Sequence, residues 1–259
     1  MSFNFYKYQG AGNDFVMIDD RNQTFPVSEE TIAKLCNRYF GIGGDGLILL
    51  QNDAESDFKM VYFNSDGRES TMCGNGGRCV VRFAHNLGLI QNETKFHAID
   101  GIHEAIIEED KIHLKMTDVL EVFANMDFVF LNTGSPHHVE FVKNVEKVDV
   151  QKIGARIRSG EPYFEEGTNV NFIEITGNNS LSIRTYERGV EGETLACGTG
   201  VTAAAIAAFE TGKLHENEIQ VKAVGGNLSV KFERTLAGHY ENIWLTGSAE
   251  FVFKGEIYF

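Results

Sequence analysis

Apolar and polar positions alternate along much of the chain in short segments, a pattern typical of β-strands. The segments 3–8 and 14–18 flank a turn at Gly10-Ala11-Gly12, which indicates a strand pair at the N-terminus. The same pattern predicts further strands at 47–51, 58–63, 95–99, 104–108, 111–116, 243–246 and 249–253.

One amphipathic helix is predicted between the second and third of these strands. Ser28 is a favourable N-cap, and the negative charges of Glu29 and Glu30 suit the first helical turn. The apolar face, spaced i, i+3, i+4 and i+7, consists of Ile32, Leu35, Cys36 and Tyr39.

Two other helices are predicted to be more deeply buried. One follows Cys73 and is expected to end near Gly88, since glycine commonly terminates helices. The other, at 200–211, is almost entirely small or apolar. A helix that is apolar all round must be covered on every side, and a sheet wrapped around a central helix would cover it.

The two buried helices begin at similar sequences. Cys73 and Cys197 each start a Cys-Gly-x-Gly motif, and they lie 124 residues apart. Coincidence in a glycine-rich chain is the alternative, but an internal duplication explains more, because the same offset brings other residues into register. These pairs are Gly10 and Gly134, Asn13 and His137, Gly43 and Gly167, Ser56 and Ser180, Tyr62 and Tyr186, Glu69 and Glu193, and Gly88 and Gly212.

The duplication predicts an α/β (α+β) fold with two pseudo-symmetric domains. Residues 1–117 would form the first domain, which carries Cys73, and residues 118–247 the second, which carries Cys197. In each domain a sheet wrapped around the central helix would bury that helix on all sides.

Charge and composition narrow the functional classes. The 259 residues carry a formal net charge of −14, which argues against nucleic acid or an anionic membrane as a partner. The longest apolar stretch, 201–209, is too short to span a bilayer, and the N-terminus lacks the pattern of a signal peptide. We therefore expect a cytoplasmic protein with reduced thiols.

Three other motifs have plainer interpretations. The segment 41–46 fits G-x-G-x-x-G, but a helix precedes it and a strand follows, the reverse of a dinucleotide-binding fingerprint, so a turn is predicted. The pair His137-His138 has no further ligand at metal-binding spacing, so no metal site is predicted. Cys36 and Cys79 lie in apolar helical patterns and are expected to be buried and inert.

Cys73 and Cys197 are the candidates for chemistry. Each lies at the start of a helix, where free N–H groups and the helix dipole favour negative charge. The pKa of a thiol there is expected below the usual value of about 8.5, and a substrate carboxylate can bind the same N–H groups. Two such cysteines on opposite sides of one carbon could invert a stereocentre, one removing a proton and the other delivering one.

The motifs of the chain resemble those of the diaminopimelate epimerase family, in the same order from near the N-terminus to Gly200. They are Gly10-Ala-Gly-Asn-Asp-Phe15, Asn64-Ser-Asp-Gly67, Met72-Cys-Gly-Asn-Gly-Gly-Arg-Cys79, Gly134-Ser-Pro-His137, Thr168-Asn-Val170, Tyr186-Glu-Arg-Gly189 and Ala196-Cys-Gly-Thr-Gly200. The resemblance implies an enzyme that needs no pyridoxal phosphate or other cofactor and interconverts LL- and meso-2,6-diaminopimelate in lysine and cell-wall biosynthesis. It also implies two pseudo-symmetric domains, each a mostly antiparallel sheet or barrel around a central helix. A homodimer, and a final strand at about 248–259 that returns to the first domain, are implied as well.

The resemblance assigns roles to individual residues. Cys73 and Cys197 match the catalytic cysteines, and His137 and Glu187 match other residues of the catalytic site. The matched substrate-binding residues are Asn13, Asn64, Gly74, Asn75, Asn169, Glu187, Arg188, Gly198 and Thr199. The guanidinium of Arg188 suits a bidentate hold on the distal carboxylate.

The chain departs from the family pattern at two positions. Ser135 replaces the asparagine that many members carry there, and Gly46 replaces a glutamine found in some members. A proline or hydroxyproline racemase of the same architecture is the nearest alternative, although such a substrate would leave Arg188 with little to bind. A phenazine-pathway isomerase would not be expected to keep both cysteines, and a thiol-redox protein would be expected to show a CxxC motif, which is absent.

Overall fold

The computed structural model describes residues 2–259 and divides into two compact units. Unit 1 comprises the chain up to Leu114 together with Gly247–Phe259, and unit 2 comprises Lys115–Thr246. The sequence-based boundary at 117 is three residues later than the observed one, and the strand at the C-terminus lies in unit 1.

The strands of unit 1 form one continuous series. In pairing order they are β18 (Glu250–Tyr258), β1 (Ser2–Gly10), β2 (Asn13–Asp19), β3 (Gly46–Gln51), β4 (Phe58–Asn64), β6 (Glu93–Ala98), β7 (Gly101–Glu108) and β8 (Lys111–Lys115). The short β5 (Glu69–Ser70) pairs with β4. The pairs β2–β3 and β4–β6 are parallel and the others are antiparallel.

Unit 2 repeats this series. Its strands are, in pairing order, β9 (Val122–Ala124), β10 (Val129–Asn132), β11 (Pro136–Phe141), β12 (Asn169–Gly177), β13 (Ser180–Glu187), β15 (Glu218–Ala223), β16 (Gly226–Arg234) and β17 (Tyr240–Ser248). The short β14 (Gly192–Thr194) pairs with β13. The parallel pairs, β11–β12 and β13–β15, occupy the same places in the series as those of unit 1, which confirms the predicted fold class and the internal repeat.

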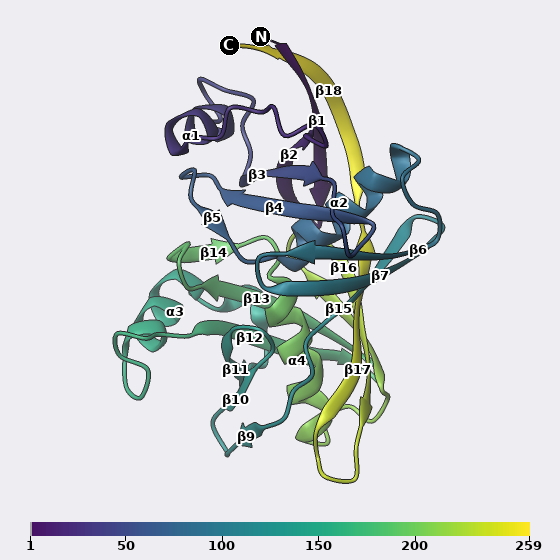
Figure 1. Ribbon diagram of the computed structural model, residues 1–259. Coiled ribbons are helices and arrows are strands. Elements are labelled where there is room, and N and C mark those ends of the chain that lie inside the picture. Colours follow the sequence, from purple (N-terminus) through teal and green to yellow (C-terminus); the bar gives the residue numbers. More distant parts are fainter. Residues whose placement is uncertain (1) are drawn as a thin grey trace. The chain divides into compact units, whose positions relative to one another are not determined.

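Each series curves around a central helix (Figure 1). In unit 1, α2 (Gly74–Asn86) packs against β18 and β1 at one end of the series and against β7 near the other. In unit 2, α4 (Gly198–Glu210) contacts strands from β9 to β16, and every side chain from Val201 to Ala208 is buried. The prediction of an all-round buried helix is therefore confirmed, although the helix begins two residues before the expected 200.

Each unit also carries a shorter helix on the outer side of its sheet. In unit 1, α1 (Glu29–Cys36) packs Ile32 and Leu35 against Leu47 and Leu49 of β3. Ile48, between these leucines, points the other way and lies against Gly76 of α2. This double cover explains why β3 is a continuous apolar run rather than an alternating one.

The outer helix of unit 2 is α3 (Val150–Ser159), which follows the short 3-10 turn η1 (Val145–Lys147). Val150 and the η1 residue Val145 pack against Val170, Phe172 and Tyr186 of the sheet. The two units thus share one plan, with one helix inside the curved sheet and one outside it.

Tyr39 was predicted on the apolar face of α1, and this prediction is wrong. The helix ends at Cys36, because the side chain of Asn37 accepts hydrogen bonds from the backbone N–H groups of Tyr39 and Phe40 and turns the chain away. Tyr39 is 90% exposed as a result. Ile99, placed at the end of a predicted strand, is likewise exposed, since β6 ends at Ala98.

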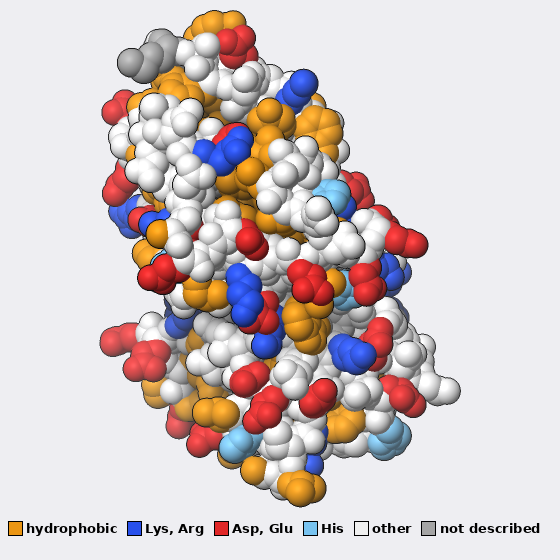
Figure 2. Space-filling view, turned by 45° about the vertical axis from the view of Figure 1, so that its right-hand side comes forward, with side chains coloured by type: hydrophobic (Ala, Val, Ile, Leu, Met, Phe, Trp, Pro, Cys, Tyr) orange, Lys and Arg blue, Asp and Glu red, His pale blue; other side chains and the backbone are white. Residues whose placement is uncertain are grey.

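Charged side chains of both signs lie close together on the face of the molecule drawn in Figure 2. Figure 2 shows lysine and arginine interspersed with aspartate and glutamate on one face of the molecule. Among residues 2–259, no helix has the length and apolar character needed to cross a bilayer.

Because α4 is enclosed on all sides, a larger side chain on this helix should lower the stability of the protein. Ala204 is fully buried, so Ala204→Leu forces three extra carbons against surrounding strands and should destabilise the protein by about 1–3 kcal/mol. Thermal unfolding followed by circular dichroism measures the effect. Ala237→Leu, the same change at an exposed turn, should leave the melting temperature nearly unchanged. Equal effects of both substitutions would contradict the central position of α4.

Candidate active site

Cys73 is the N-cap of α2 and holds the first turn of that helix. Its backbone is extended, with φ −98° and ψ 136°, and its Sγ accepts a hydrogen bond from the N–H of Gly76 at 3.4 Å. A Cβ at Gly76 would lie 3.1 Å from Ile48, and one at Gly77 would lie 2.8 Å from the sulfur of Met72. The glycines therefore allow the helix to begin deep against the sheet, with the thiol at its positive end.

Asn13 and Asn75 lie beside the Cys73 thiol. The Oδ1 atom of Asn13 accepts a hydrogen bond from Nδ2 of Asn75 at 3.3 Å, and the Sγ atom of Cys73 lies 3.7 Å from the same oxygen. Both amides were predicted as substrate-binding residues, and the structure places them together at the start of α2.

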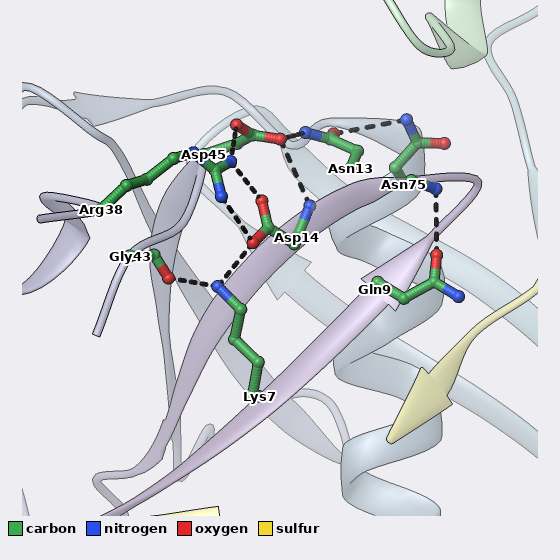
Figure 3. A network of polar contacts seen from close by, with 9 residues as sticks. Lys7, Gln9, Asn13, Asp14, Arg38, Gly43, Asp45 and Asn75 are labelled. Carbon is green, nitrogen blue, oxygen red and sulfur yellow. Dashed lines mark hydrogen bonds and ion pairs between the residues drawn. The ribbon is translucent and has the colours of Figure 1, made fainter. Parts of the chain in front are cut away.

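A network of charged residues holds Asn13 in place (Figure 3). Asp45 accepts a hydrogen bond from the Asn13 side chain, and Arg38 bridges Asp45 and Asp14 at 2.7 and 2.6 Å. The Nζ atom of Lys7 lies 2.7 Å from Asp14. Burial opposes ionisation of Asp14, but hydrogen bonds and charge from Arg38 and Lys7 outweigh it and lower its pKa to about 2. Asp14 therefore stays ionised at neutral pH and keeps its ion pairs with Arg38 and Lys7.

Asn64 lies at the end of β4 and is exposed. Its Oδ1 atom accepts a hydrogen bond from the hydroxyl of Tyr62 at 2.8 Å. β4 also pairs Asn64 with Gly46, the position where some family members carry a glutamine. A Cβ at Gly46 would lie 2.4 Å from the carbonyl oxygen of Phe63 and 2.6 Å from the ring of Tyr62, so this backbone leaves no room for a side chain there.

Cys197 is the N-cap of α4 and has a different partner. Its Sγ atom lies 3.4 Å from the hydroxyl of Thr199, and its side chain makes no cap hydrogen bond to the helix backbone. A Cβ at Gly200 would lie 2.5 Å from Oδ1 of Asn171 and 3.4 Å from the ring of His137. Glycine at this position therefore lets the histidine approach the start of the helix.

A chain of hydrogen bonds leads from Asn171 through His137 to Thr199. The Thr185 hydroxyl donates to Oδ1 of Asn171 at 3.0 Å, so Nδ2 of that amide faces the other way and donates to Nδ1 of His137 at 3.1 Å. The network thus assigns the ring proton to Nε2, which lies 2.9 Å from the Thr199 hydroxyl. Since that hydroxyl accepts from the ring, its own hydrogen is available to the Cys197 sulfur.

His137 is fully buried, and this determines its charge. Desolvation is the main cause, with the positive charge of Arg188 second, and together they lower its pKa to about 3. His137 is therefore neutral at physiological pH, and it can orient Thr199 without carrying charge itself.

The remaining predicted residues of unit 2 surround this chain of hydrogen bonds. Nδ2 of Asn169 donates to the Ser135 hydroxyl at 3.2 Å, and its Oδ1 accepts from the backbone N–H of Arg188 at 2.9 Å. Ser135 also lies 3.0 Å from Nε2 of His137, so the residue that departs from the family pattern is part of the polar cluster. Arg188 is exposed and donates to the backbone carbonyl of Glu166, while the adjacent Glu187 ends β13 and is half-buried.

The repeat offset of 124 residues relates the two clusters. Asn13 and Asn75 of unit 1 correspond to His137 and Thr199 of unit 2, and both pairs are joined by side-chain hydrogen bonds. The same backbone positions thus carry a polar pair next to each cysteine, with different side chains in each unit.

Several residues in the polar clusters beside Cys73 and Cys197 were not predicted from the sequence. Asn171 could have been found, since it lies two residues after Asn169 on one strand and therefore shares its face. The network of Lys7, Asp14, Arg38 and Asp45 gave no signal, because its members come from separate elements whose contacts depend on the fold.

Cys36 and Cys79 are buried thiols away from any helix start, as predicted. Desolvation raises the pKa of Cys36 to about 12 and that of Cys79 well above its usual range, so both are neutral. His138 bonds to Tyr163 and Glu140. Within residues 2–259, no group of three or more His, Cys, Asp or Glu side chains is arranged to hold a metal ion.

The low pKa of His137 predicts a pH-dependent term in stability. The unfolded chain binds a proton at this residue below about pH 6.5 and the folded chain does not until about pH 3, so stability is lost as pH falls through this window. Denaturant unfolding at several pH values should show a weaker loss for His137→Gln than for the parent chain. Parallel pH profiles for the two proteins would contradict the neutral, buried state.

Comparisons with known proteins agree with this architecture. A family model for diaminopimelate epimerase matches residues 5–121 and 129–252. The diaminopimelate epimerase of Flavobacterium psychrophilum is 56% identical over 97% of this chain and 99% of its own, and that of Chlorobaculum tepidum is 44% identical over 96% and 98%. The crystal structure of a phenazine biosynthesis protein of the PhzF family from Bacillus anthracis shares the fold, with a TM-score of 0.78 at 16% identity and full coverage of both chains. The chain belongs to the diaminopimelate epimerase family.

Proposed function

We propose that the chain is an amino-acid epimerase that interconverts LL-2,6-diaminopimelate and meso-diaminopimelate. In this role it would serve lysine and peptidoglycan precursor biosynthesis in the cytoplasm, where thiols remain reduced. The proposal rests on family membership over nearly the whole chain. The observation that carries it is the placement of Cys73 and Cys197 as N-caps of equivalent central helices, one in each unit.

The two cysteines would act as the two acid/base groups of the reaction. The thiolate of one removes the hydrogen of Cα as a proton, forming an S–H bond and leaving a carbanion. The thiol of the other then delivers its proton to the opposite face of Cα and becomes the thiolate. Inversion is complete, and the next turnover starts from the opposite protonation state of the pair.

The helix starts would stabilise the charge that develops on the substrate. The N–H groups of Gly74, Asn75, Gly198 and Thr199 belong to first helical turns, where backbone donors have no acceptor within the helix. They suit the α-carboxylate of the substrate, which takes up charge as Cα loses its proton. This preorganised donor set would replace the electron sink of a cofactor, so we propose that no cofactor or metal is needed.

The distal end of the substrate carries a second amino group and carboxylate. The exposed guanidinium of Arg188 suits that carboxylate, and Glu187 suits the ammonium group. The amides of Asn13, Asn64 and Asn169 offer both donors and acceptors, which a substrate with two amino-acid ends requires. A proline or hydroxyproline substrate has no distal end to bind these residues.

Replacement of either cysteine should abolish epimerisation without abolishing all proton exchange. Cys73→Ser and Cys197→Ser each remove one of two required groups, so turnover should fall by at least about 10²–10⁴-fold. The surviving thiolate can still remove and return a proton on its own face. Mass spectrometry of diaminopimelate incubated in D₂O should therefore show slow exchange at one Cα hydrogen.

Cys36→Ala and Cys79→Ala are the matched controls for this experiment. Both thiols are buried and neutral, so turnover should stay within a few-fold of the parent chain. An inactive, folded Cys79→Ala variant together with an active Cys197→Ser variant would place the chemistry in unit 1 alone and refute the two-cysteine mechanism.

We further propose that the enzyme is a homodimer that associates through β18. Phe251, Val252 and Phe253 are consecutive and all exposed, so both faces of this strand present apolar side chains to solvent. Consecutive exposed apolar residues on a strand are a liability in a monomer and are typical of an interface.

A charge on β18 should dissociate this dimer. Val252 is 53% exposed, and Val252→Lys would place an ammonium group in the apolar contact. Size-exclusion chromatography with light scattering should give a dimer for the parent chain and a monomer for the variant. Val224→Lys, at an exposed valine of unit 2, should remain dimeric. A monomeric parent chain, or a dimeric Val252→Lys variant, would contradict the assignment.

A further inference from the structure

Arg78 is a fully buried cation that the proposed reaction does not use. Its relative exposure is 0%, and it lies five residues after Cys73 on α2. No carboxylate among residues 2–259 pairs with it, and its Nε atom finds no acceptor there. An arginine side chain cannot lose its proton in a protein, so a full positive charge is retained inside unit 1.

The guanidinium folds back toward the start of its own helix. Nη1 donates to the carbonyl of Gly74 at 3.2 Å, and Nη2 donates to Oδ1 of Asn75 at 2.8 Å. Gly10 packs closely against this part of α2, since a Cβ there would lie 3.3 Å from the carbonyl oxygen of Asn75 and 3.3 Å from Sγ of Cys79. Arg78 therefore fixes the Asn75 amide so that its Nδ2 donates to Asn13 beside the Cys73 thiol.

This position is unfavourable for a cation unless an anion is near. The N-terminal end of a helix is the positive end of its dipole, which repels a guanidinium. Burial without a counter-charge adds a large desolvation cost. Two hydrogen bonds to neutral oxygens compensate only part of this cost, so the charge indicates an anionic partner at the start of α2.

Among the titratable groups near Arg78, Cys73 is the one that can supply this negative charge. The thiols of Cys79 and Cys73 are the two groups whose ionisation interacts with Arg78, and Cys79 is neutral because burial raises its pKa. Every carboxylate on the strands packed against α2 already has a partner, and β3 contributes no titratable side chain. The pairs are Asp14 with Lys7 and Arg38, Asp19 with Arg21, Glu104 with Lys95, Glu108 with His113, Glu250 with Gln9, and Glu256 with Tyr258.

The equivalent position in unit 2 carries no charge. The repeat offset places Thr202 where Arg78 stands, and its hydroxyl donates to the carbonyl of Gly198 at 3.0 Å. Gly198 is itself the equivalent of Gly74, so both side chains satisfy the same carbonyl of the central helix. The hydrogen bond is thus preserved between the repeats, and the charge is present in only one of them.

We propose that Arg78 is a positioning residue that orients Asn75 and stabilises the thiolate of Cys73, so that Cys73 is the anionic and Cys197 the protonated cysteine of the resting enzyme. The proposal deepens the two-cysteine function and rests on it for its catalytic meaning. The charge effect itself is a property of the chain without substrate, so it can be tested separately.

The first measurement uses the unaltered protein. Iodoacetamide reacts with thiolates, and peptide mass spectrometry follows Cys73 and Cys197 separately as a function of pH. Alkylation of Cys73 should have its midpoint at least about one pH unit below that of Cys197. Equal midpoints, or a lower midpoint for Cys197, would overturn the proposal whatever the outcome for epimerase activity.

The second measurement removes the charge. In Arg78→Met and Arg78→Gln the Cys73 midpoint should rise by about one pH unit, which is about tenfold less alkylation at a pH below it, while the Cys197 midpoint stays in place. Arg78→Lys keeps the charge and should restore the Cys73 midpoint, even if it holds Asn75 less well. The acidic limb of the pH profile of kcat/KM should move with the Cys73 midpoint.

Thr202→Val is the matched control, because it removes the hydrogen bond to the equivalent carbonyl without removing a charge. It should leave Cys197 alkylation within about twofold of the parent chain, whereas a tenfold loss there would show that hydrogen bonding, and not charge, sets thiol reactivity. Failure of Arg78→Lys to restore the Cys73 midpoint would likewise overturn the electrostatic role. A normal alkylation pattern with no epimerisation would instead refute the proposed function alone.

Discussion

The N-terminal end of a completely enclosed helix is the feature on which the rest of the structure depends. The first N–H groups of any helix lack acceptors within that helix, and the helix dipole makes that end positive. When the sheet covers every side of the helix, as it does for α4, the end of the helix is where ligand and backbone donors can meet. A cysteine as N-cap places a sulfur there, and Gly76 and Gly200 let the start of each helix pack closely against neighbouring side chains.

The two repeats share the same backbone arrangement, but the side chains around the two cysteines differ. Both cysteines are N-caps of helices of equal length, and both carry a hydrogen-bonded side-chain pair at equivalent positions. However, Cys73 Sγ accepts from a backbone N–H, whereas Cys197 Sγ contacts the Thr199 hydroxyl that a neutral histidine orients. The proposed inversion requires two groups on opposite faces of Cα but does not require them to have identical surroundings, so it is compatible with these different partners.

The sequence predicted those elements that follow from the spacing of nearby residues. The period of the apolar residues located most strands, and the duplicated Cys-Gly-x-Gly motif located both central helices. It failed at Tyr39, where one Asn37 side chain ended a helix whose apolar spacing continued. It could not find Arg78 or assign the charge of His137, because burial and the partners of a buried group depend on strands that are distant in sequence. Family resemblance supplied the candidate residues, but not the hydrogen bonds that orient them.

The strand order also constrains how the chain folds. In unit 2, β10 is covered by β9, which precedes it by a few residues, whereas in unit 1 the equivalent strand β1 is covered by β18 from the far end of the chain. Without β18, the edge of β1 is left without its antiparallel partner, and unpaired edges invite wrong associations. This pairing closes the largest loop in the protein, and its entropy cost must be met before the contact forms. Unit 1, which carries Cys73, therefore depends on the last residues of the chain, whereas unit 2, which carries Cys197, is assembled from residues that are contiguous in sequence.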